Sequence, residues 1–250
     1  MKYNRPHATA TWGTMGKDWE IGVDFQRLNR ERLQRAKDSI KASGLGGVLC
    51  FTFDNIRYVT GTHIGEWGRD KSDRYVLVTA DSEPFLWDPA PPAKRKSAPW
   101  LNGRIDAPIS TLQGAIQPSF GVQDDFARQI KKKMVEMGIA GQPLGIDLME
   151  LDMLRALEKE GIEVVDGQQA MLDAREIKTG DEIELLKQAA AMVDGTYMDI
   201  AQAIRPGARE SDLVAVAHDR LFRLGSERVE CINSVAGPRG APHSHTFSDR

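Results

Sequence analysis

The pattern of apolar and polar positions divides the chain into a first part, where helices alternate with short strands, and a second part that is mainly helical. In the first part, apolar residues recur every three or four positions in some segments and form short, continuous runs in others. The helical spacing covers residues 25–40, 126–137 and 151–157, and the short runs that predict strands cover residues 47–51, 56–61, 74–79, 145–147 and 163–165. Helices alternating with strands predict an α/β domain.

The second part predicts two helices and one strand. Apolar residues recur at helical spacing from Ile183 to Ile204, so one face of this helix is expected to be buried over more than five turns. Residues 205–207 (Arg-Pro-Gly) end that helix, a second amphipathic helix follows over residues 213–224, and residues 232–235 read as a strand. Residues 89–118 are rich in proline and polar residues and predict irregular surface with one short strand at most.

We therefore predict three regions. Residues 1–20 lack periodicity and form an N-terminal arm, residues 21–168 form the α/β domain, and residues 169–250 begin a second domain that is incomplete in this chain.

Composition and charge exclude several classes of partner. The 250 residues carry a formal net charge of −3 at pH 7, which gives no electrostatic reason to expect nucleic acid or an anionic membrane as a partner. Cys50 and Cys231 are the only two cysteines, and Cys50 lies in an apolar run typical of a buried thiol. With no apolar run of membrane-spanning length, the sequence favours a soluble cytoplasmic protein.

Two local patterns have simple structural interpretations. Residues 44–47 (Gly-Leu-Gly-Gly) precede a strand and do not open a helix, so they predict a helix stop and not a phosphate-binding loop. The basic clusters at residues 94–96 and 131–133 are short and predict solvated surface.

Several motifs resemble the family of creatinase, prolidase, aminopeptidase P and methionine aminopeptidase. In the second domain these are Arg175, Lys178, Glu182 and Ile183, the Arg-Pro-Gly turn at 205–207, and the ending with Pro242-His243 and Ser248-Asp249-Arg250. In the first domain the likeness rests on residues 55–61 (Asn-Ile-Arg-Tyr-Val-Thr-Gly). Residues 55–58 and 237–239 look more like the dimethylsulfoniopropionate-lyase-like branch of this family.

The resemblance implies a creatinase-like N-terminal domain followed by the first part of a pita-bread domain. It also implies a homodimer that binds a divalent metal pair (Mn, Zn, Fe or Co) through two aspartates, a histidine and two glutamates. All five ligands would lie beyond Arg250, and the visible sequence offers no substitute cage, since His218 and Asp219 sit in a helix without ligand partners at useful spacing.

The histidines near the end of the chain are the candidate catalytic residues. In prolidase-like relatives, a histidine before the Ser-Asp-Arg element faces the substrate, where imidazole can shuttle a proton. Pro242 favours His243 as the counterpart, His245 is the second candidate, and the alternative is two solvated loop histidines. Arg239 is a candidate clamp for a substrate carboxylate or, alternatively, a loop anchor.

A loop of the first domain is a further candidate for substrate binding. His63, Glu66 and Trp67 follow residues 55–61, and in creatinase-like dimers a loop from this region reaches the neighbour's active site. The alternative is that the aromatic side chain covers the local core.

The resemblance leaves three functional hypotheses. The first is a metal-dependent hydrolase of the Xaa-Pro peptidase or creatinase type, acting on a peptide-like or small amidic substrate; the 250-residue chain itself would be inactive without the metal-ligand half. The second is a carbon–sulfur lyase on the same fold. The third is a non-catalytic binding or dimerisation module.

Overall fold

The computed structural model describes residues 22–65, 72–112 and 114–240, and the chain divides into two compact units. One unit is Asp24–Thr179, and the other combines Met1–Val23 with Gly180–Arg250. The predicted N-terminal arm, residues 1–20, lies outside the described residues.

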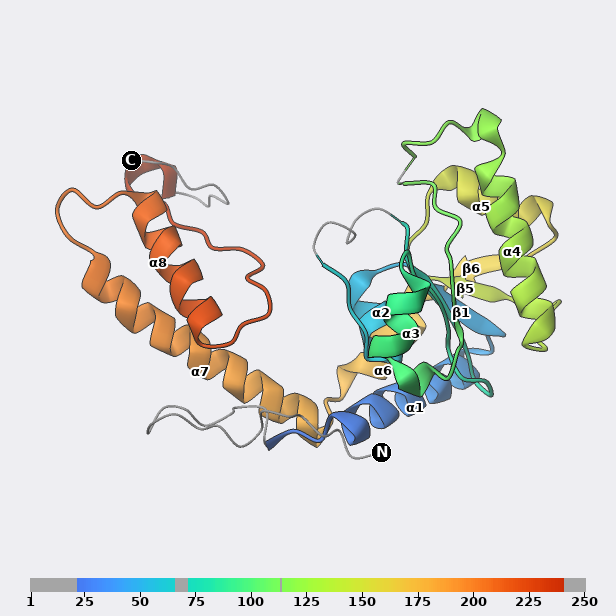
Figure 1. Ribbon diagram of the computed structural model, residues 1–250, viewed down its shortest axis with the longest axis horizontal. Helices are drawn as coiled ribbons and strands as arrows, with labels where there is room; N and C mark the ends of the chain where they lie inside the picture. Colours follow the sequence, from blue (N-terminus) through green and yellow to red (C-terminus); the bar gives the residue numbers. More distant parts are fainter. Residues whose placement is uncertain (1–21, 66–71, 113, 241–250) are drawn as a thin grey trace. The chain divides into compact units, whose positions relative to one another are not determined.

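The Asp24–Thr179 unit contains six strands within the described residues, and its elements follow one another in α/β order (Figure 1). The elements are α1 (Phe25–Ser43), β1 (Gly47–Cys50), α2 (Phe53–Thr60), β2 (Tyr75–Thr79), β3 (Phe85–Trp87), α3 (Pro91–Ser97), η3 (Pro99–Leu101), β4 (Ile105–Asp106), η4 (Pro118–Phe120), α4 (Val122–Glu136), β5 (Leu144–Ile146), α5 (Leu151–Lys159), β6 (Val164–Asp166) and α6 (Gln168–Glu176). The helices predicted over residues 25–40, 126–137 and 151–157 are confirmed, as are four of the five predicted strands.

The six strands form one mixed sheet in the order β4-β3-β2-β1-β5-β6. Strands β1, β5 and β6 run parallel, whereas β2 is antiparallel to both β1 and β3. Strands β3 and β4 are also parallel. Helix α5 connects the parallel strands β5 and β6, whereas a short turn connects the antiparallel strands β2 and β3, as expected for each type of pairing.

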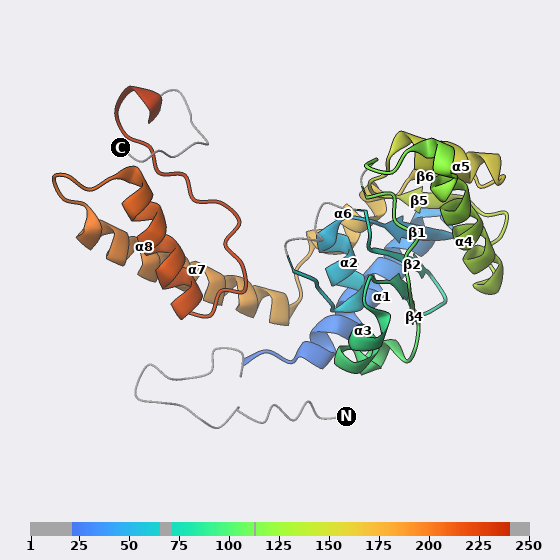
Figure 2. The same ribbon diagram turned by 45° about the horizontal axis from the view of Figure 1, so that its top comes forward.

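Helices cover both faces of the sheet (Figure 2). One face packs against α1, α2 and α6, through residues such as Ile40, Ile56 and Met171. The other packs against α4 and α5, through residues such as Phe126 and Leu157. Side chains of successive strand residues alternate between these two cores, because strand side chains point to opposite faces.

The end of α1 confirms the predicted helix stop. Gly44 adopts a left-handed conformation with φ of 72°, and its amide donates to the carbonyl of Lys41 at 3.3 Å. A glycine carries no steric penalty in this conformation.

The predicted strand over residues 56–61 is wrong, because this segment belongs to helix α2. Its β-branched and aromatic residues suggested a strand, but Ile56, Val59 and Thr60 are buried at helical spacing. The helix begins where the Asp147 carboxylate accepts the amides of Phe51 and Thr52 at 2.7 and 3.1 Å. A side chain more than ninety residues away therefore stabilises the N-terminal turn.

Two further segments differ from the predictions. Residues 89–118 contain the predicted short strand, β4, but also helix α3, whose first residue is Pro91, a position where proline is favourable. Helix α6 was not predicted; its buried residues Ala170, Met171 and Ala174 pack into the same core as α1.

The second unit contains two long helices, α7 (Gly180–Ala203) and α8 (Glu210–Arg223), and a 3-10 turn, η5 (Gly237–Gly240). The two helices pack together, and Arg220 of α8 forms an ion pair with Asp199 of α7 at 2.8 Å. Both helices were predicted. The strand predicted over residues 232–235 is wrong, since these residues adopt no regular secondary structure and have no ladder partner among the described strands.

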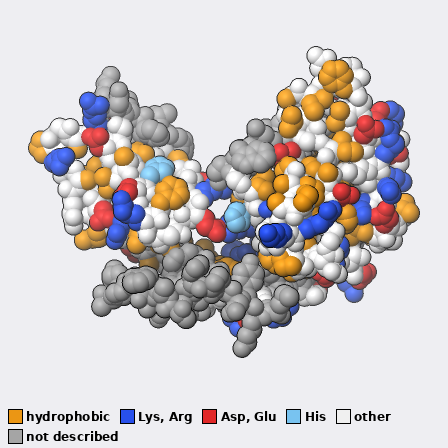
Figure 3. Space-filling view, viewed as in Figure 1, with side chains coloured by type: hydrophobic (Ala, Val, Ile, Leu, Met, Phe, Trp, Pro, Cys, Tyr) orange, Lys and Arg blue, Asp and Glu red, His pale blue; other side chains and the backbone are white. Residues whose placement is uncertain are grey.

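The predicted burial of one α7 face is also wrong for the described chain. Ile183, Leu186, Val193, Tyr197 and Ile204 are between 44% and 65% exposed, and hydrophobic side chains show on the surface of this unit (Figure 3). Helix α8 contacts a different face of α7, where Arg220 pairs with Asp199 and Leu224 lies beside Gly195. Periodicity identified the apolar stripe correctly, but it carries no information about what covers the stripe.

Candidate functional site

Most of the predicted site residues lie outside the described part of the chain. Trp67, Glu66, His243 and His245 belong to segments that the structure does not describe, and Arg239 is described only through its backbone in η5. His63 is the one candidate whose side chain is described, and it is exposed. The described residues near these segments, His63 and Ala236, are held by side chains from elsewhere in the chain.

A buried ion pair lies at the base of the loop that begins at Thr62 and His63. Arg74 Nε donates to Asp88 Oδ2 at 2.9 Å, and the two side chains are only 3% and 1% exposed. A terminal nitrogen of Arg74 also donates to the hydroxyl of Thr62. Burial lowers the pKa of Arg74 from its usual value, while Asp88 opposes that shift. The hydrogen bond between Arg74 and Thr62 thus connects the residues on either side of the loop.

Lys94 joins this network from helix α3. Its Nζ donates to the carbonyl oxygen of His63 at 2.8 Å and lies 3.9 Å from Asp88 Oδ2. Burial lowers the pKa of Lys94, again opposed by Asp88. The prediction that residues 94–96 form a solvated basic cluster is wrong for Lys94, because its ammonium group fixes the backbone of His63.

The end of α2 is fixed by hydroxyl groups. The Thr60 and Thr62 hydroxyl oxygens lie 2.7 Å apart, and Thr60 donates to the carbonyl of Ile56 at 2.6 Å. Trp100 Nε1 donates to the carbonyl of Thr60 at 2.8 Å. The backbone leading to His63 is therefore held by several polar contacts with little solvent access.

The sequence analysis did not identify Arg74 and Asp88 as part of any site. Arg74 directly precedes β2 and Asp88 directly follows β3, where Tyr75 is paired with Trp87. The antiparallel register therefore sets Arg74 opposite Asp88. The sequence did contain a signal for this pair, because Arg74 directly precedes one apolar run and Asp88 directly follows the next, and the two residues carry opposite charges.

The carboxyl ends of the parallel strands β1 and β5 form a second polar centre. Such a crevice often binds ligands in α/β proteins. Here the Asp147 carboxylate accepts from two amides of the α2 N-terminus, from Thr52 Oγ1 at 2.6 Å and from Asn55 Nδ2 at 2.9 Å. The chain's own carboxylate therefore satisfies the donors that a bound anion would use.

Asn55 connects this centre to the end of the unit. Its side-chain amide also donates to Gln168 at 3.1 Å, and its oxygen accepts from Arg175 at 2.9 Å. Tyr58 donates to the carbonyl of Ala174 at 2.8 Å. Two residues of the motif at 55–61 thus hold the C-terminal part of α6.

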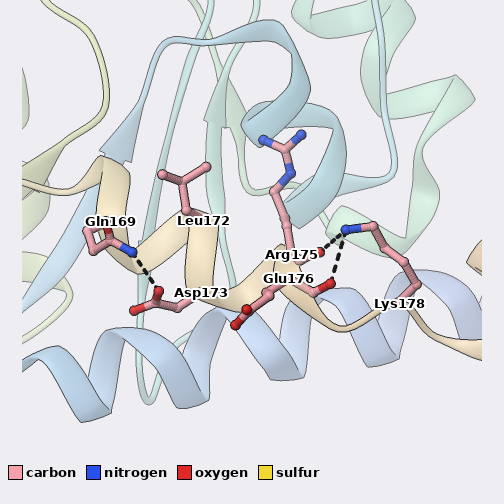
Figure 4. Close-up of a pocket in the computed structure, with 6 residues that line it drawn as sticks. All are labelled: Gln169, Leu172, Asp173, Arg175, Glu176 and Lys178. Atoms are coloured by element: carbon pink, nitrogen blue, oxygen red, sulfur yellow. Dashed lines mark hydrogen bonds between the residues drawn. The ribbon is translucent and has the colours of Figure 1, made fainter.

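A surface pocket of about 430 Å³ lies beside the end of α6 (Figure 4). It is lined by Gln169, Leu172, Asp173, Arg175, Glu176 and Lys178. Gln169 donates to Asp173 at 2.7 Å, Lys178 to the Glu176 carbonyl at 3.2 Å, and the Arg175 side chain extends away toward Asn55. The pocket contains none of the predicted site residues, and its polar groups are largely engaged with one another.

The described residues do not provide a site for a divalent metal pair. Within residues 22–65, 72–112 and 114–240, no three His, Cys, Asp or Glu side chains converge. His218 contacts the carbonyl of Val214 at 3.0 Å through a ring nitrogen, and Asp219 pairs with Arg223 at 2.8 Å, so each engages its own helix. We assign no reaction step to a metal held by these residues.

The second unit holds one more anchor point. The amide of Ala236 donates to Glu210 Oε1 at 2.6 Å, and Glu210 is only 6% exposed. Ala236 directly precedes η5, which contains Arg239. Glu210 therefore fixes the backbone just before the predicted site residues.

The mixed sheet with helices on both faces is the fold of the N-terminal domain of creatinase and prolidase relatives. The sequence model of the Creatinase/Prolidase N-terminal domain family matches residues 32–177, and the chain belongs to this family. The predicted fold class and the family resemblance are confirmed.

Curated relatives include enzymes with different activities. The chain is 27% identical over 249 residues to the dimethylsulfoniopropionate lyase DddP of Roseovarius nubinhibens, covering 94% of this chain and 54% of that protein. It is 23% identical to the creatinase of a Bacillus species, covering 77% of this chain and 44% of the relative. The chain spans about half the length of these relatives.

Solved structures show the same fold at low sequence identity. The dipeptidase PepE of Mycobacterium ulcerans superimposes with a TM-score of 0.67 at 21% identity, over 92% of this chain and 58% of that one. The prolidase of Thermococcus sibiricus gives the same TM-score over 91% of this chain and 58% of that one, also at 21% identity.

No helix in the described part of the chain is both long and apolar enough to cross a membrane.

Proposed function

We propose that the chain is the N-terminal portion of a metal-dependent hydrolase of the Xaa-Pro peptidase or creatinase type, acting on a peptide-like or small amidic substrate. The observation that carries the proposal is the family match over residues 32–177, which together with α7 and α8 accounts for most of the described chain. A cytoplasmic homodimer is part of the proposal. The two free cysteines, one buried and one exposed, are compatible with a reducing compartment.

The proposed reaction needs a divalent metal pair whose ligands come from outside the described residues. When bound, such a pair polarises the scissile carbonyl and activates water. In this chain we assign His243, or alternatively His245, to move a proton at the substrate, and Arg239 to hold a substrate carboxylate. His63 and Trp67 are proposed to contact substrate in the active site of the neighbouring subunit of the homodimer.

The first test is hydrolysis of an Xaa-Pro dipeptide by the protein isolated from its native source, with release of free proline as the readout. A strong chelator should abolish the activity, and added Mn²⁺ should restore it. His243→Gln should lower kcat more than it raises KM, whereas the matched control His218→Gln, on α8, should leave both unchanged. Full activity in the chelated protein would refute the metal-dependent proposal.

A carbon–sulfur lyase is the second candidate, because the DddP relative aligns over 94% of this chain. In that reaction a base removes the proton next to the carboxylate, the carbon–sulfur bond breaks, and dimethyl sulfide leaves with its bonding electron pair to give acrylate. No water is consumed. Release of dimethyl sulfide and acrylate from dimethylsulfoniopropionate, without proline release from dipeptides, would favour the lyase over the hydrolase. Metal-loaded protein without either activity would favour a binding module.

A further inference from the structure

The second unit contains a carboxylate whose contact lies far from it in sequence and next to the candidate catalytic segment. Glu210 is the first residue of α8, and its Oε1 accepts from the amide of Ala236 at 2.6 Å. The two residues are 26 positions apart. Glu210 is 6% exposed, and a hydrogen bond from an amide to a shielded carboxylate is among the stronger ones in proteins.

The path of the chain makes this contact consequential. Helix α8 runs from Glu210 to Arg223, about 20 Å at the usual rise per residue, and the chain then returns to the beginning of the helix at Ala236. Figure 1 shows the returning segment running back along α8. Residues 231–236 adopt no regular secondary structure, so no backbone ladder holds them there. The contact with Glu210 holds Ala236, the last residue of this returning segment, beside the first residue of α8.

The helix itself is held firmly. Arg220 pairs with Asp199 at 2.8 Å, and Val214 and Ala217 are buried. At the N-terminus of α8, the Arg209 amide donates to Asp212 at 2.9 Å, and a carboxylate such as that of Glu210 is favoured there by the helix dipole. The hydrogen bond to Glu210 thus fixes the Ala236 backbone relative to the packed helix α8.

We propose that Glu210 is a positioning residue, which places the turn at 237–240 and thereby the backbone of Arg239. The catalytic part of this inference rests on the proposed function, but the structural part does not. Glu210 is not proposed to touch substrate. It acts by fixing the backbone at Ala236, directly before the turn at 237–240, and a small misplacement of a substrate-binding group costs orders of magnitude in rate.

The structural part is tested by hydrogen exchange of the Ala236 amide in the 250-residue chain. Glu210→Ala removes the acceptor and is expected to speed exchange at Ala236 at least about tenfold. Glu210→Asp keeps the carboxylate at the helix N-terminus but shortens its reach, and is expected to speed exchange similarly. Glu210→Gln keeps an acceptor oxygen and is expected to retain most of the protection.

Glu184→Ala, on α7, is the matched control and should not change exchange at Ala236. Helix content and melting temperature identify a variant that fails to fold. If Glu210→Ala fails to fold, the exchange measurement on Glu210→Asp still tests the proposal. Unchanged Ala236 exchange in a folded Glu210→Asp or Glu210→Ala variant would overturn the proposal.

The catalytic part is tested in the protein from its native source, with whichever substrate it turns over. Glu210→Ala is expected to lower kcat about tenfold at an unchanged melting temperature, and Glu210→Gln to restore at least half of it. Faster exchange at Ala236 with unchanged kcat would confirm the contact and refute the catalytic role. Absence of activity in the unmodified protein would count against the proposed function alone, since the exchange result stands independently.

Discussion

Arg74 and Asp88 form an ion pair that is almost completely shielded from solvent, with Nε and Oδ2 at 2.9 Å. Removing two charges from water costs several kcal/mol, so a buried pair is stable only when both partners are present and well bonded. Arg74 also donates to Thr62, and Asp88 accepts from the amide of Ala90 at 3.1 Å. The pair thus serves mainly to hold the base of the loop that begins at His63.

Removing one partner of this pair should destabilise the Asp24–Thr179 unit strongly. Arg74→Met or Asp88→Asn leaves a buried group unpaired, and we expect each to lower the free energy of unfolding by about 3–5 kcal/mol. Urea denaturation of the 250-residue chain measures the change. The control is Arg223→Ala, which removes an exposed ion pair with Asp219 and should leave the urea midpoint unchanged. A loss below about 1 kcal/mol for both buried variants would show that the pair is not needed for stability.

Replacement of Asp147 should unfold the start of α2. Asp147→Ala leaves the amides of Phe51 and Thr52 without their acceptor and removes one of the two acceptors of the Asn55 side-chain amide, and should cost at least about 3 kcal/mol. Asp147→Asn keeps one acceptor oxygen and should cost less. Hydrogen exchange of the α2 amides would locate the effect, and equal protection in Asp147→Ala and the unmodified chain would contradict the assigned role.

The sequence predicted the sheet better than it predicted the polar centres. Strands such as residues 47–51 and 74–79 were recognisable because continuous apolar runs between turn residues reflect burial on both faces. Helix α2 was misread because Asp147 accepts the amides of the two residues directly before it, and no local pattern reveals so distant a partner. The Arg74–Asp88 pair becomes evident only once the register of β2 and β3 is known.

The candidate site was less predictable still. His243, His245 and Trp67 came from resemblance to a family, and they fall outside the described residues, whereas His63 is described and exposed. Glu210 carried no signal, because a glutamate in a first helical turn is ordinary for capping reasons alone. Its contact with Ala236 depends on the return of the chain along α8, which hydrophobic periodicity does not encode.

Tyr75 should make stability depend on pH in the alkaline range. Burial raises the pKa of Tyr75 well above its usual value of about 10. The folded state therefore holds its proton more tightly than the unfolded state, so this contribution is complete below about pH 10 and declines as the pH rises toward the folded pKa. At neutral pH, Tyr75→Phe should destabilise the chain by about 1–2 kcal/mol, because Ile109 and Gln129 lose their hydroxyl partner.

Above pH 10 the difference between Tyr75→Phe and the unmodified chain should shrink by about 1.4 kcal/mol per pH unit. Urea midpoints measured from pH 7 to 11 give this slope. Phe51→Leu is the control, since Phe51 packs 5.2 Å from the Tyr75 ring but cannot titrate, and its destabilisation should be independent of pH. A Tyr75→Phe difference that stays constant to pH 11 would rule out the assigned linkage.

The apolar stripe of α7 should tolerate charge in this chain. Leu186 is 55% exposed and Tyr197 is 65% exposed, so Leu186→Lys and Tyr197→Lys remove little buried surface and should change the free energy of unfolding by less than about 0.5 kcal/mol. Val214→Lys places a charge at a buried position on α8 and should destabilise strongly. Because exposed apolar stripes promote association, the two stripe variants should also self-associate less than the unmodified chain, which sedimentation velocity would measure. If Leu186→Lys instead destabilised the chain as much as Val214→Lys, the apolar stripe of α7 would be buried in solution. The burial predicted from the helical periodicity of residues 183–204 would then be correct.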